Sequence, residues 1–297
     1  MFPFLISHRS GSKFATHIRG GKLLLCLCAV SVAGGLLLNG CANQPPSKAS
    51  QSGVRLRIRL NYAAPVNRNE KYFFLLNNVD DSTAPGSVPV SAPLPNNTYG
   101  NGFATASDAG ASGKPGFTDF VLFGFNDYEN ASVGGYSLFH VVNRATGRED
   151  NRINFRYVDT PLLSTLPSND QSQPDANTLI FEIDMAQLER DVNGNLLTDA
   201  INRARQRRYV QVNIVSTNLT PTDTTAVGKI FDSLGDNRQG DGRGSFLRLD
   251  LTQTGVITSS DERFAEVTEP SNTSDTVGGN DPQIDLRSWS IEVVRTN

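Results

Sequence analysis

Residues 54–60 alternate strictly between apolar and charged side chains, reading Val-Arg-Leu-Arg-Ile-Arg-Leu. Successive side chains of an extended chain point to opposite faces, so this period of two predicts a β-strand covered on one face only. Its other face carries three arginines, whose like charges repel unless they are solvated or paired across strands. We expect Glu182 and Asp184 to be their partners. The arginines are Arg55, Arg57 and Arg59.

Eight further segments have the composition of short strands. They are rich in β-branched and aromatic residues, and clusters of Gly, Pro, Asn and Asp separate them. Such a series favours an antiparallel sandwich over alternating β and α units. We therefore predict a mainly β fold, an immunoglobulin-like or jelly-roll-like antiparallel β-sandwich, formed as a single domain by residues 54–297. The segments are residues 71–76, 117–125, 136–142, 153–158, 178–184, 209–217, 246–251 and 286–294.

One stretch between two of these strands is typical of a short helical insertion. Asp184 is a candidate helix cap because Gln187 follows three residues later, as in a capping box. A turn at 193–195 precedes a second segment, which we expect Thr198 to cap and to end near Gln206. The remaining connections are long, and loops of such length are usually functional or mobile. They span residues 79–116, 159–177, 218–244 and 259–283.

The last predicted strand indicates which of its faces is buried. Within residues 286–294, Trp289, Ile291 and Val293 alternate with a more polar set. We expect these three side chains to face the core. Trp289 is the only tryptophan of the chain, so its fluorescence reports on that packing.

The first 40 residues differ in composition from the rest of the chain. They carry four basic side chains and no acidic one, which leaves a net charge of −7 for residues 41–297. Sixteen uncharged, mostly apolar residues (23–38) follow the basic stretch, as in an export signal. No apolar run in residues 41–297 reaches the ~18 residues of a membrane span. Residues 1–40 are therefore predicted to be a signal peptide.

The end of this segment, from Leu38 to Cys41, resembles the lipobox of bacterial lipoproteins. There a signal peptidase cuts before a cysteine whose thiol carries a diacylglyceryl group, and Gly40 matches the small residue before it. Asn39 departs from the usual small or aliphatic residue. The resemblance implies a lipidated Cys41. Two alternatives remain, namely an ordinary cleavable signal using the small residues Gly40 and Ala42, or an uncleaved anchor.

A polar segment follows the cysteine. Residues 42–53 contain two prolines and lack periodicity, so with Cys41 they are predicted to form a flexible tether, residues 41–53. Ala42 lacks the aspartate that keeps similar lipoproteins in the inner membrane. The expected location is therefore the cell envelope, and in a cell with two membranes the outer one.

Three stretches after the lipobox-like segment also form a recognisable sequence pattern. Residues 57–77 contain an opening strand, an Ala-Pro-Val-Asn turn and an aromatic strand; residues 99–103 read Tyr-Gly-Asn-Gly-Phe; residues 285–293 form the closing strand. Together they resemble a group of bacterial lipoproteins of unknown function, familiar from cyanobacteria. The resemblance implies an envelope protein with a β-sandwich-like domain, and it implies no reaction.

Cysteine and histidine are too scarce for most catalytic or metal sites. Cys41 is the only cysteine after residue 40, which excludes an intramolecular disulfide or a Cys-based zinc site there. His140 is the only histidine in that part, and in an apolar strand it is most often a packed residue with a satisfied ring nitrogen. Nucleophile elbows, phosphate-binding loops and dinucleotide fingerprints are absent from the sequence. We expect no catalytic residue, no metal and no cofactor.

Two charged clusters allow two interpretations each. Residues 232–244 hold Asp232, Asp236 and Asp241 in a glycine-rich loop that could supply oxygens to calcium. Arginines in the same loop favour solvated turns instead. Residues 203–208 hold four arginines, which suit an anionic partner or, as we favour, a helix end running into a solvated strand.

Aromatic and acidic residues offer the remaining candidates. Tyr99 and Phe103 are candidate ligand-binding residues that could stack on sugars, although such rings more often close the end of a core. The acidic pairs, Glu182 with Asp184 and Asp261 with Glu262, are not placed across a cleft as glycosidases require.

The sequence therefore predicts a lipid-anchored cell-envelope protein without enzymatic activity, acting as a structural or ligand-binding module. The alternative is a carbohydrate-active enzyme or a carbohydrate-binding accessory domain. The expected partners are the membrane, through the N-terminal lipid, and an envelope glycan or protein. Export and net negative charge argue against nucleic acid.

Overall fold

The computed structural model describes residues 52–89, 104–106, 116–124, 135–142, 154–219, 228–235, 246–260, 266 and 275–296. Cys41, Tyr99 and Phe103, three residues singled out by the sequence, lie outside this part of the chain. Within it, none of the helices combines the length and the apolar character needed to cross a membrane.

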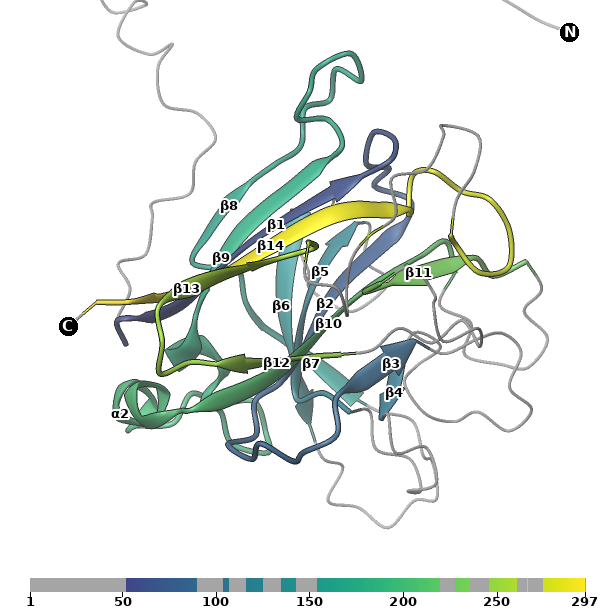
Figure 1. The fold of residues 1–297 in the computed structure, drawn as a ribbon. Helices are drawn as coiled ribbons and strands as arrows, with labels where there is room; N and C mark the ends of the chain where they lie inside the picture. Colours follow the sequence, from purple (N-terminus) through teal and green to yellow (C-terminus); the bar gives the residue numbers. More distant parts are fainter. Residues whose placement is uncertain are drawn as a thin grey trace, which may run out of the picture. The chain divides into compact units, whose positions relative to one another are not determined.

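The described strands form two antiparallel sheets that pack together as a sandwich (Figure 1). The mainly β, sandwich-like fold predicted from the sequence is thus confirmed. In order, the five described strands of the first sheet are β13 (Gly255–Thr258), β14 (Leu286–Arg295), β1 (Val54–Tyr62), β9 (Thr178–Asp184) and β8 (Leu163–Thr165).

The second sheet has seven strands among the described residues. In order, they are β11 (Phe231–Ser233), β10 (Tyr209–Thr217), β2 (Lys71–Asn77), β5 (Asp119–Gly124), β6 (Gly135–Val142) and β7 (Asn154–Asp159), with β12 (Leu247–Asp250) also pairing with β10. A separate ladder joins β3 (Ser87–Pro89) to β4 (Ala104–Ala106).

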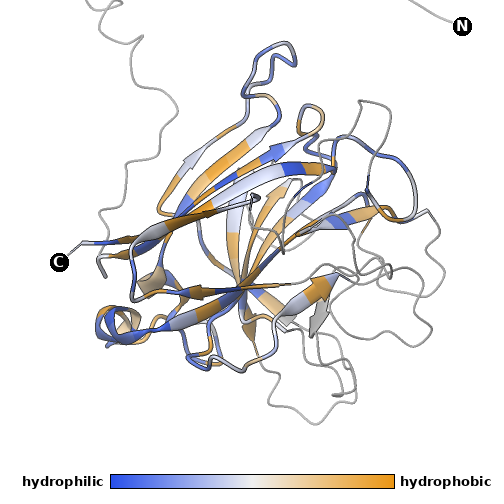
Figure 2. Ribbon diagram, viewed as in Figure 1, coloured by the Kyte–Doolittle hydropathy of each residue, from blue (hydrophilic) through white to orange (hydrophobic). Residues whose placement is uncertain are grey.

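The main core lies between the two sheets. Leu56, Ile58 and Leu60 of β1 are buried there, whereas the arginines between them face outward. Phe181 of β9 packs edge-on against Phe74 of β2, with ring centroids 5.5 Å apart, so the sheets meet through aromatic side chains. Hydrophobic and hydrophilic bands alternate along the strands of the first sheet in Figure 2.

The closing strand β14 presents the face that the sequence predicts. Trp289, Ile291 and Val293 are at most 3% exposed and belong to the core between the sheets. The prediction that these three side chains face the core is confirmed.

The second sheet is also covered on its other face. Phe73, Leu75, Phe120 and Leu122 form part of a second buried cluster there, separate from the main core. Phe120 stacks on Phe139 with ring centroids 4.8 Å apart. Because both faces are buried, β2 and β5 are continuously apolar where β1 alternates.

Of the two predicted partners of the β1 arginines, the structure confirms one. Glu182 lies 2.6 Å from Arg55 Nη1 and 3.1 Å from Arg57 Nε, and Arg57 also reaches Glu292 at 2.7 Å. Asp184 is the Cα partner of Arg55, but its carboxylate instead accepts hydrogen bonds from Ser52 and from the Ala186 N–H. The partner prediction is therefore corrected for Asp184, which turns to cap the next helix.

The helical insertion consists of η2 (Met185–Leu188), a 3-10 helix, and α2 (Ala200–Gln206). The predicted capping box is present, since Asp184 caps η2 and Gln187 accepts a hydrogen bond from the Asp184 N–H. The predicted cap Thr198 is wrong by one residue, because Asp199 occupies the N-cap of α2. Asp199 makes no side-chain capping bond and pairs instead with Arg203 at 2.8 Å.

Five short strands lie where the sequence predicted none. β3 and β4 fall in the predicted loop 79–116, β8 in the loop 159–177 and β11 in the loop 218–244. β13 follows the strand predicted at 246–251. Each has three or four residues, too few to show a period of two. One of them, β11, carries the first residue of the candidate site.

Candidate metal centre

Asp232 lies in the middle of β11, at the edge of the second sheet. The register of β10 and β11 places it directly opposite Ser216, on the side that faces the first sheet. Its side chain is only 4% exposed. Its carboxylate accepts hydrogen bonds from the Ser233 N–H at 2.7 Å and from the Leu286 N–H at 2.6 Å. Because Leu286 begins β14, Asp232 links the two sheets.

Asp285 immediately precedes β14 and is fully buried. Its carbonyl accepts a hydrogen bond from the Ala63 N–H at 2.9 Å, just after β1 ends. Its carboxylate lies 2.8 Å from Arg287 Nη2. The pairing of β1 with β14 therefore fixes the backbone that carries this aspartate.

Asp275 is partly buried and belongs to a segment docked against β11. Val277, two residues later, exchanges two backbone hydrogen bonds with Phe231, at 3.0 and 2.8 Å. Gly278 has a φ of +93°, and a Cβ there would stand 2.3 Å from the Lys229 carbonyl oxygen. A side chain at this position would therefore force the segment away from β11.

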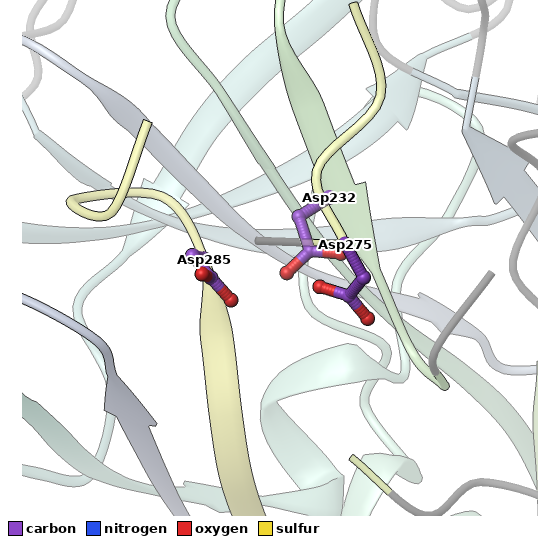
Figure 3. Close-up of side chains that lie close together, drawn as sticks. All are labelled: Asp232, Asp275 and Asp285. Atoms are coloured by element: carbon purple, nitrogen blue, oxygen red, sulfur yellow. The ribbon is translucent and has the colours of Figure 1, made fainter. Parts of the chain in front are cut away.

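The three carboxylates converge although they come from distant parts of the chain. Each offers an oxygen that lies within 4.8 Å of the others (Figure 3). Figure 3 shows Asp285 at the start of β14, with the carboxylates of Asp232 and Asp275 beside it. Clusters of carboxylate oxygens are what hard divalent cations such as Ca²⁺ and Mg²⁺ select.

A fourth carboxyl group lies nearby. Glu266 Oε1 accepts hydrogen bonds from the Gly235 N–H at 2.9 Å and from Trp289 Nε1 at 3.1 Å. Burial raises the pKa of Asp232 well above its usual value, and the negative charges of Asp275, Glu266 and Asp285 raise it further. The Leu286 N–H works in the opposite direction. These surroundings thus favour the protonated form of Asp232.

Two buried hydroxyl residues, Tyr62 and Ser216, lie on strands next to this cluster. Tyr62, the Cα partner of Leu286, is 1% exposed, and its pKa is raised first by burial and then by the charges of Asp232, Tyr136 and Glu266. Ser216 lies near the phenol and lowers its pKa, but the two hydroxyls are not in hydrogen-bonding geometry. Neither oxygen has a hydrogen-bond partner in the described structure.

The sequence favoured solvated turns for the loop that contains Asp232. The structure instead buries Asp232 and brings it to two aspartates that the sequence did not connect with it. Asp236 and Asp241, its predicted companions, lie outside the described residues. No spacing pattern links the three acids, because they come together only when the sheet of β11 packs on the sheet of β14.

His140 takes the structural role that the sequence predicts. Its Nδ1 lies 2.7 Å from Asp119 Oδ1, directly across the β5–β6 pair. The Thr118 hydroxyl donates to the other Asp119 oxygen at 2.7 Å. Burial raises the pKa of Asp119, while the contact with His140 lowers it. This is a packed strand histidine with a satisfied ring nitrogen.

The arginine-rich segment also has structural contacts. Arg207 pairs with Glu189 at 2.5 Å, Arg205 Nε donates to the Ser52 carbonyl at 3.0 Å, and Arg208 lies over the Tyr209 ring. With Arg203 on Asp199, these contacts support the favoured interpretation of a helix end running into a strand.

A polar hollow of about 320 Å³ lies beside the β1–β2 connection. Arg68 at its rim donates to Asn169 at 3.2 Å, and Asn67 donates to Gln283 at 2.9 Å. The sequence gave no signal for it, because its lining comes from two separate loops and the segment before β14. The amide side chains that line it are Asn67, Asn69, Asn169, Gln171 and Gln283.

Comparisons with protein-family models, curated proteins and solved structures found no match. The resemblance to bacterial lipoproteins therefore rests on the three sequence stretches. Residues 57–77 and 285–293 lie among the described residues, and residues 99–103 do not.

Proposed function

We propose that this chain is a lipid-anchored cell-envelope protein whose sandwich domain acts as a non-enzymatic structural or ligand-binding module. The observation that carries the proposal is the order of segments at its N-terminus. A basic stretch, an apolar stretch and Cys41 are followed by the polar residues 42–53, and β1 begins at Val54. The first strand thus starts where the predicted tether ends.

The anchor explains how such a domain would be held at a membrane. One acyl chain gives only marginal membrane residence, whereas the two or three chains of a lipoprotein cysteine hold it stably. A tether of residues 42–53 reaches up to roughly 40 Å when extended. The domain would therefore remain free to contact a neighbouring glycan or protein.

Three described acids of the sheets have structural contacts, which supports a non-enzymatic role. Glu182 is engaged by two arginines, Asp184 caps η2, and Asp119 holds His140. The pair of Glu182 and Asp184, weighed above as acid and base, is thereby committed to structure. The second pair, Asp261 and Glu262, lies outside the described residues.

Lipidation can be tested in the native cell with an alkyne-tagged fatty acid. Wild-type protein should take up the label, stay in the membrane fraction in high salt and dissolve in detergent. Cys41→Ser should lose the label, whereas the matched control Cys28→Ser should keep it, because Cys28 lies in the predicted signal peptide. A soluble wild-type protein whose mature N-terminus is not Cys41 would refute the proposal.

Carbohydrate binding is the second candidate, and the polar hollow favours it. Amide side chains and an arginine are suitable hydrogen-bonding partners for sugar hydroxyls. Glycan-array binding that is lost in Gln171→Ala would assign the hollow. Loss in Tyr99→Ala instead would assign the loop at 99–103, and a wild-type protein that binds no glycan would exclude this candidate.

A further inference from the structure

We propose that the polar hollow beside the β1–β2 connection binds an acidic saccharide, and that Arg68 binds the carboxylate of the sugar. The proposal rests on carbohydrate binding, the second candidate function, and names the class of sugar that the hollow selects. It is independent of the lipid anchor. It follows from the hydrogen bonds of the lining residues, which leave the hollow rich in donors.

The loop at residues 65–69, which lines one part of the hollow, is anchored on the core. The Asn67 N–H donates to the Tyr72 hydroxyl at 3.0 Å, and this hydroxyl donates to the Gln283 carbonyl at 3.0 Å. Tyr72 is only 2% exposed. This part of the hollow is therefore formed before a ligand binds, as is usual for ligand sites.

The second loop that lines the hollow, residues 167–171, is fixed by its own turn. The Asp170 N–H donates to the Ser168 hydroxyl at 3.1 Å, and the Asp170 carboxylate accepts hydrogen bonds from Ser172 and Gln173. Asp170 is thus committed to the turn and does not line the hollow. No carboxylate is found among the described residues of the lining.

The hydrogen bonds show which amide groups of the lining remain as donors. The Asn69 N–H can only donate, so its 3.0 Å contact is with the oxygen of Asn67, whose nitrogen then donates to Gln283 at 2.9 Å. Arg68 can only donate, so its 3.2 Å contact is with the oxygen of Asn169. Gln283 and Asn169 each keep an NH₂ group, and neither group forms a hydrogen bond among the described residues.

These remaining donors require a ligand that supplies acceptors. Arg68 is the only charged side chain among the described residues of the lining, and its guanidinium forms no ion pair with a described carboxylate. A carboxylate has only acceptors, and it pairs with a guanidinium through two parallel hydrogen bonds. A carboxylate therefore suits this hollow better than a neutral hydroxyl group does.

Two further acids are close to the lining residues in the sequence, but they do not occupy the hollow. Burial raises the pKa of Glu70, and the charge of Asp281 raises it further. The Asp281 carboxylate accepts a hydrogen bond from the Gln283 N–H at 3.0 Å. Neither acid is part of the lining, so Arg68 keeps its place for an external carboxylate.

The rest of the lining favours a sugar over a peptide. Every described residue of the lining lies outside the helices and strands, so no strand edge is offered to a peptide backbone. The amides of Asn69 and Gln171 can both donate and accept, as ring hydroxyls require. Pro65 and Pro167 supply apolar surface for the C–H groups of a sugar ring. The volume of about 320 Å³ is at the small end for ligand sites, which suits a single sugar unit.

The test is a ligand-observed NMR titration of the full chain in detergent. Glucuronate and galacturonate are compared with glucose and galactose, which carry a hydroxymethyl group in place of the carboxylate. The uronates should bind about tenfold more tightly than the neutral sugars, because the hydrogen bonds to Arg68 become charge-assisted. Acetate should bind more weakly than the uronates, since it has no ring hydroxyls.

Asn169→Asp is the informative variant, because it preserves shape and places a carboxylate against Arg68. It should lose the preference for uronates and keep the weaker binding of the neutral sugars. Arg68→Gln should also bind uronates no more tightly than neutral sugars, and Arg68→Lys should recover part of the difference. The control Arg59→Gln, at an exposed arginine on β1, should bind as wild type does.

The possible failures are distinguishable. Equal binding of uronates and neutral sugars that is lost in Gln171→Ala would overturn the acidic preference and leave carbohydrate binding at the hollow in place. Absence of binding to all four sugars would overturn both. Tighter binding of acetate or of a glutamate dipeptide than of the uronates would show that the hollow is not a sugar site. Should Arg68→Gln fail to fold, the comparison of uronates with neutral sugars in the wild type still decides.

Discussion

Asp119 and Asp232 are both buried carboxylates in the second sheet, but their surroundings are opposite. Asp119 has the His140 ring nitrogen on one oxygen and the Thr118 hydroxyl on the other. Asp232 accepts two backbone N–H groups and is otherwise surrounded by further acids. Burial raises the pKa of both, yet a neighbouring group lowers it at Asp119 whereas neighbouring charges raise it again at Asp232.

The difference separates a paired carboxylate from one that lies in an acidic cluster. At Asp119 the fold supplies its own partner from the adjacent strand, so the contact is complete. At Asp232 the fold brings three carboxylates within 4.8 Å of one another, and the charges of the other two add to the rise of its pKa. Like charges close to a buried carboxylate thus raise its pKa beyond the effect of burial alone.

The largest effect is expected at Trp289, which closes the core beside the acidic cluster. Trp289→Ala should lower the free energy of unfolding by about 3–5 kcal/mol, because it removes a buried ring and leaves a cavity. Denaturant titration measures the loss. A red-shifted, solvent-like emission from the native wild-type protein would contradict the burial of this residue.

His140→Ala tests Asp119, the carboxylate that already has a partner on the adjacent strand. Removing the ring leaves the Asp119 carboxylate buried without this partner, which should cost about 3 kcal/mol of unfolding free energy. The double variant with Asp119→Asn should recover part of the loss, as a double-mutant cycle would show. A loss below about 1 kcal/mol for His140→Ala would mean that Asp119 does not depend on the histidine.

Lys229 extends the comparison to a buried cation. Burial lowers its pKa to about 7, so above that pH the folded chain has released a proton that the unfolded chain keeps up to about pH 10. Stability should therefore rise as pH increases, by about 2 kcal/mol between pH 7 and pH 9. Lys229→Met should flatten this dependence and the matched control Lys71→Met should not. A flat wild-type profile would disprove the lowered pKa.

The smallest effect is expected on the exposed outer face of β1. Arg57→Ala should cost less than about 1 kcal/mol, because Arg57 is half exposed and Glu182 keeps its contact with Arg55. The free energy of unfolding in low and high salt measures it. A larger loss would show that this outer face contributes as much as a buried pair.

The sequence predicted a strand correctly where the burial of the strand's two faces determines its pattern of apolar residues. β1 alternates because one face is buried and one is solvated, and the aromatic runs of β2 and β5 reflect burial on both faces. The three- and four-residue strands were missed, since tertiary pairing rather than local pattern defines them. The cap of α2 was misplaced by one residue because Asp199 follows Thr198 directly.

The candidate site could not be predicted in the same way. The acidic loop drew attention to Asp232, but Asp275 and Asp285 lie in other segments of the chain. Their convergence depends on β11 pairing with β10, on the bridge from Phe231 to Val277 and on the start of β14. None of these contacts leaves a local sequence signature.

An NMR pH titration of the aspartate carboxyl carbons tests the distinction between the two carboxylates most directly. The pKa of Asp232 should lie well above its usual value, whereas the pKa of Asp119 should be raised less, because His140 and Thr118 lower it. A pKa of Asp232 in the usual range, or equal pKa values for the two carboxylates, would contradict the account.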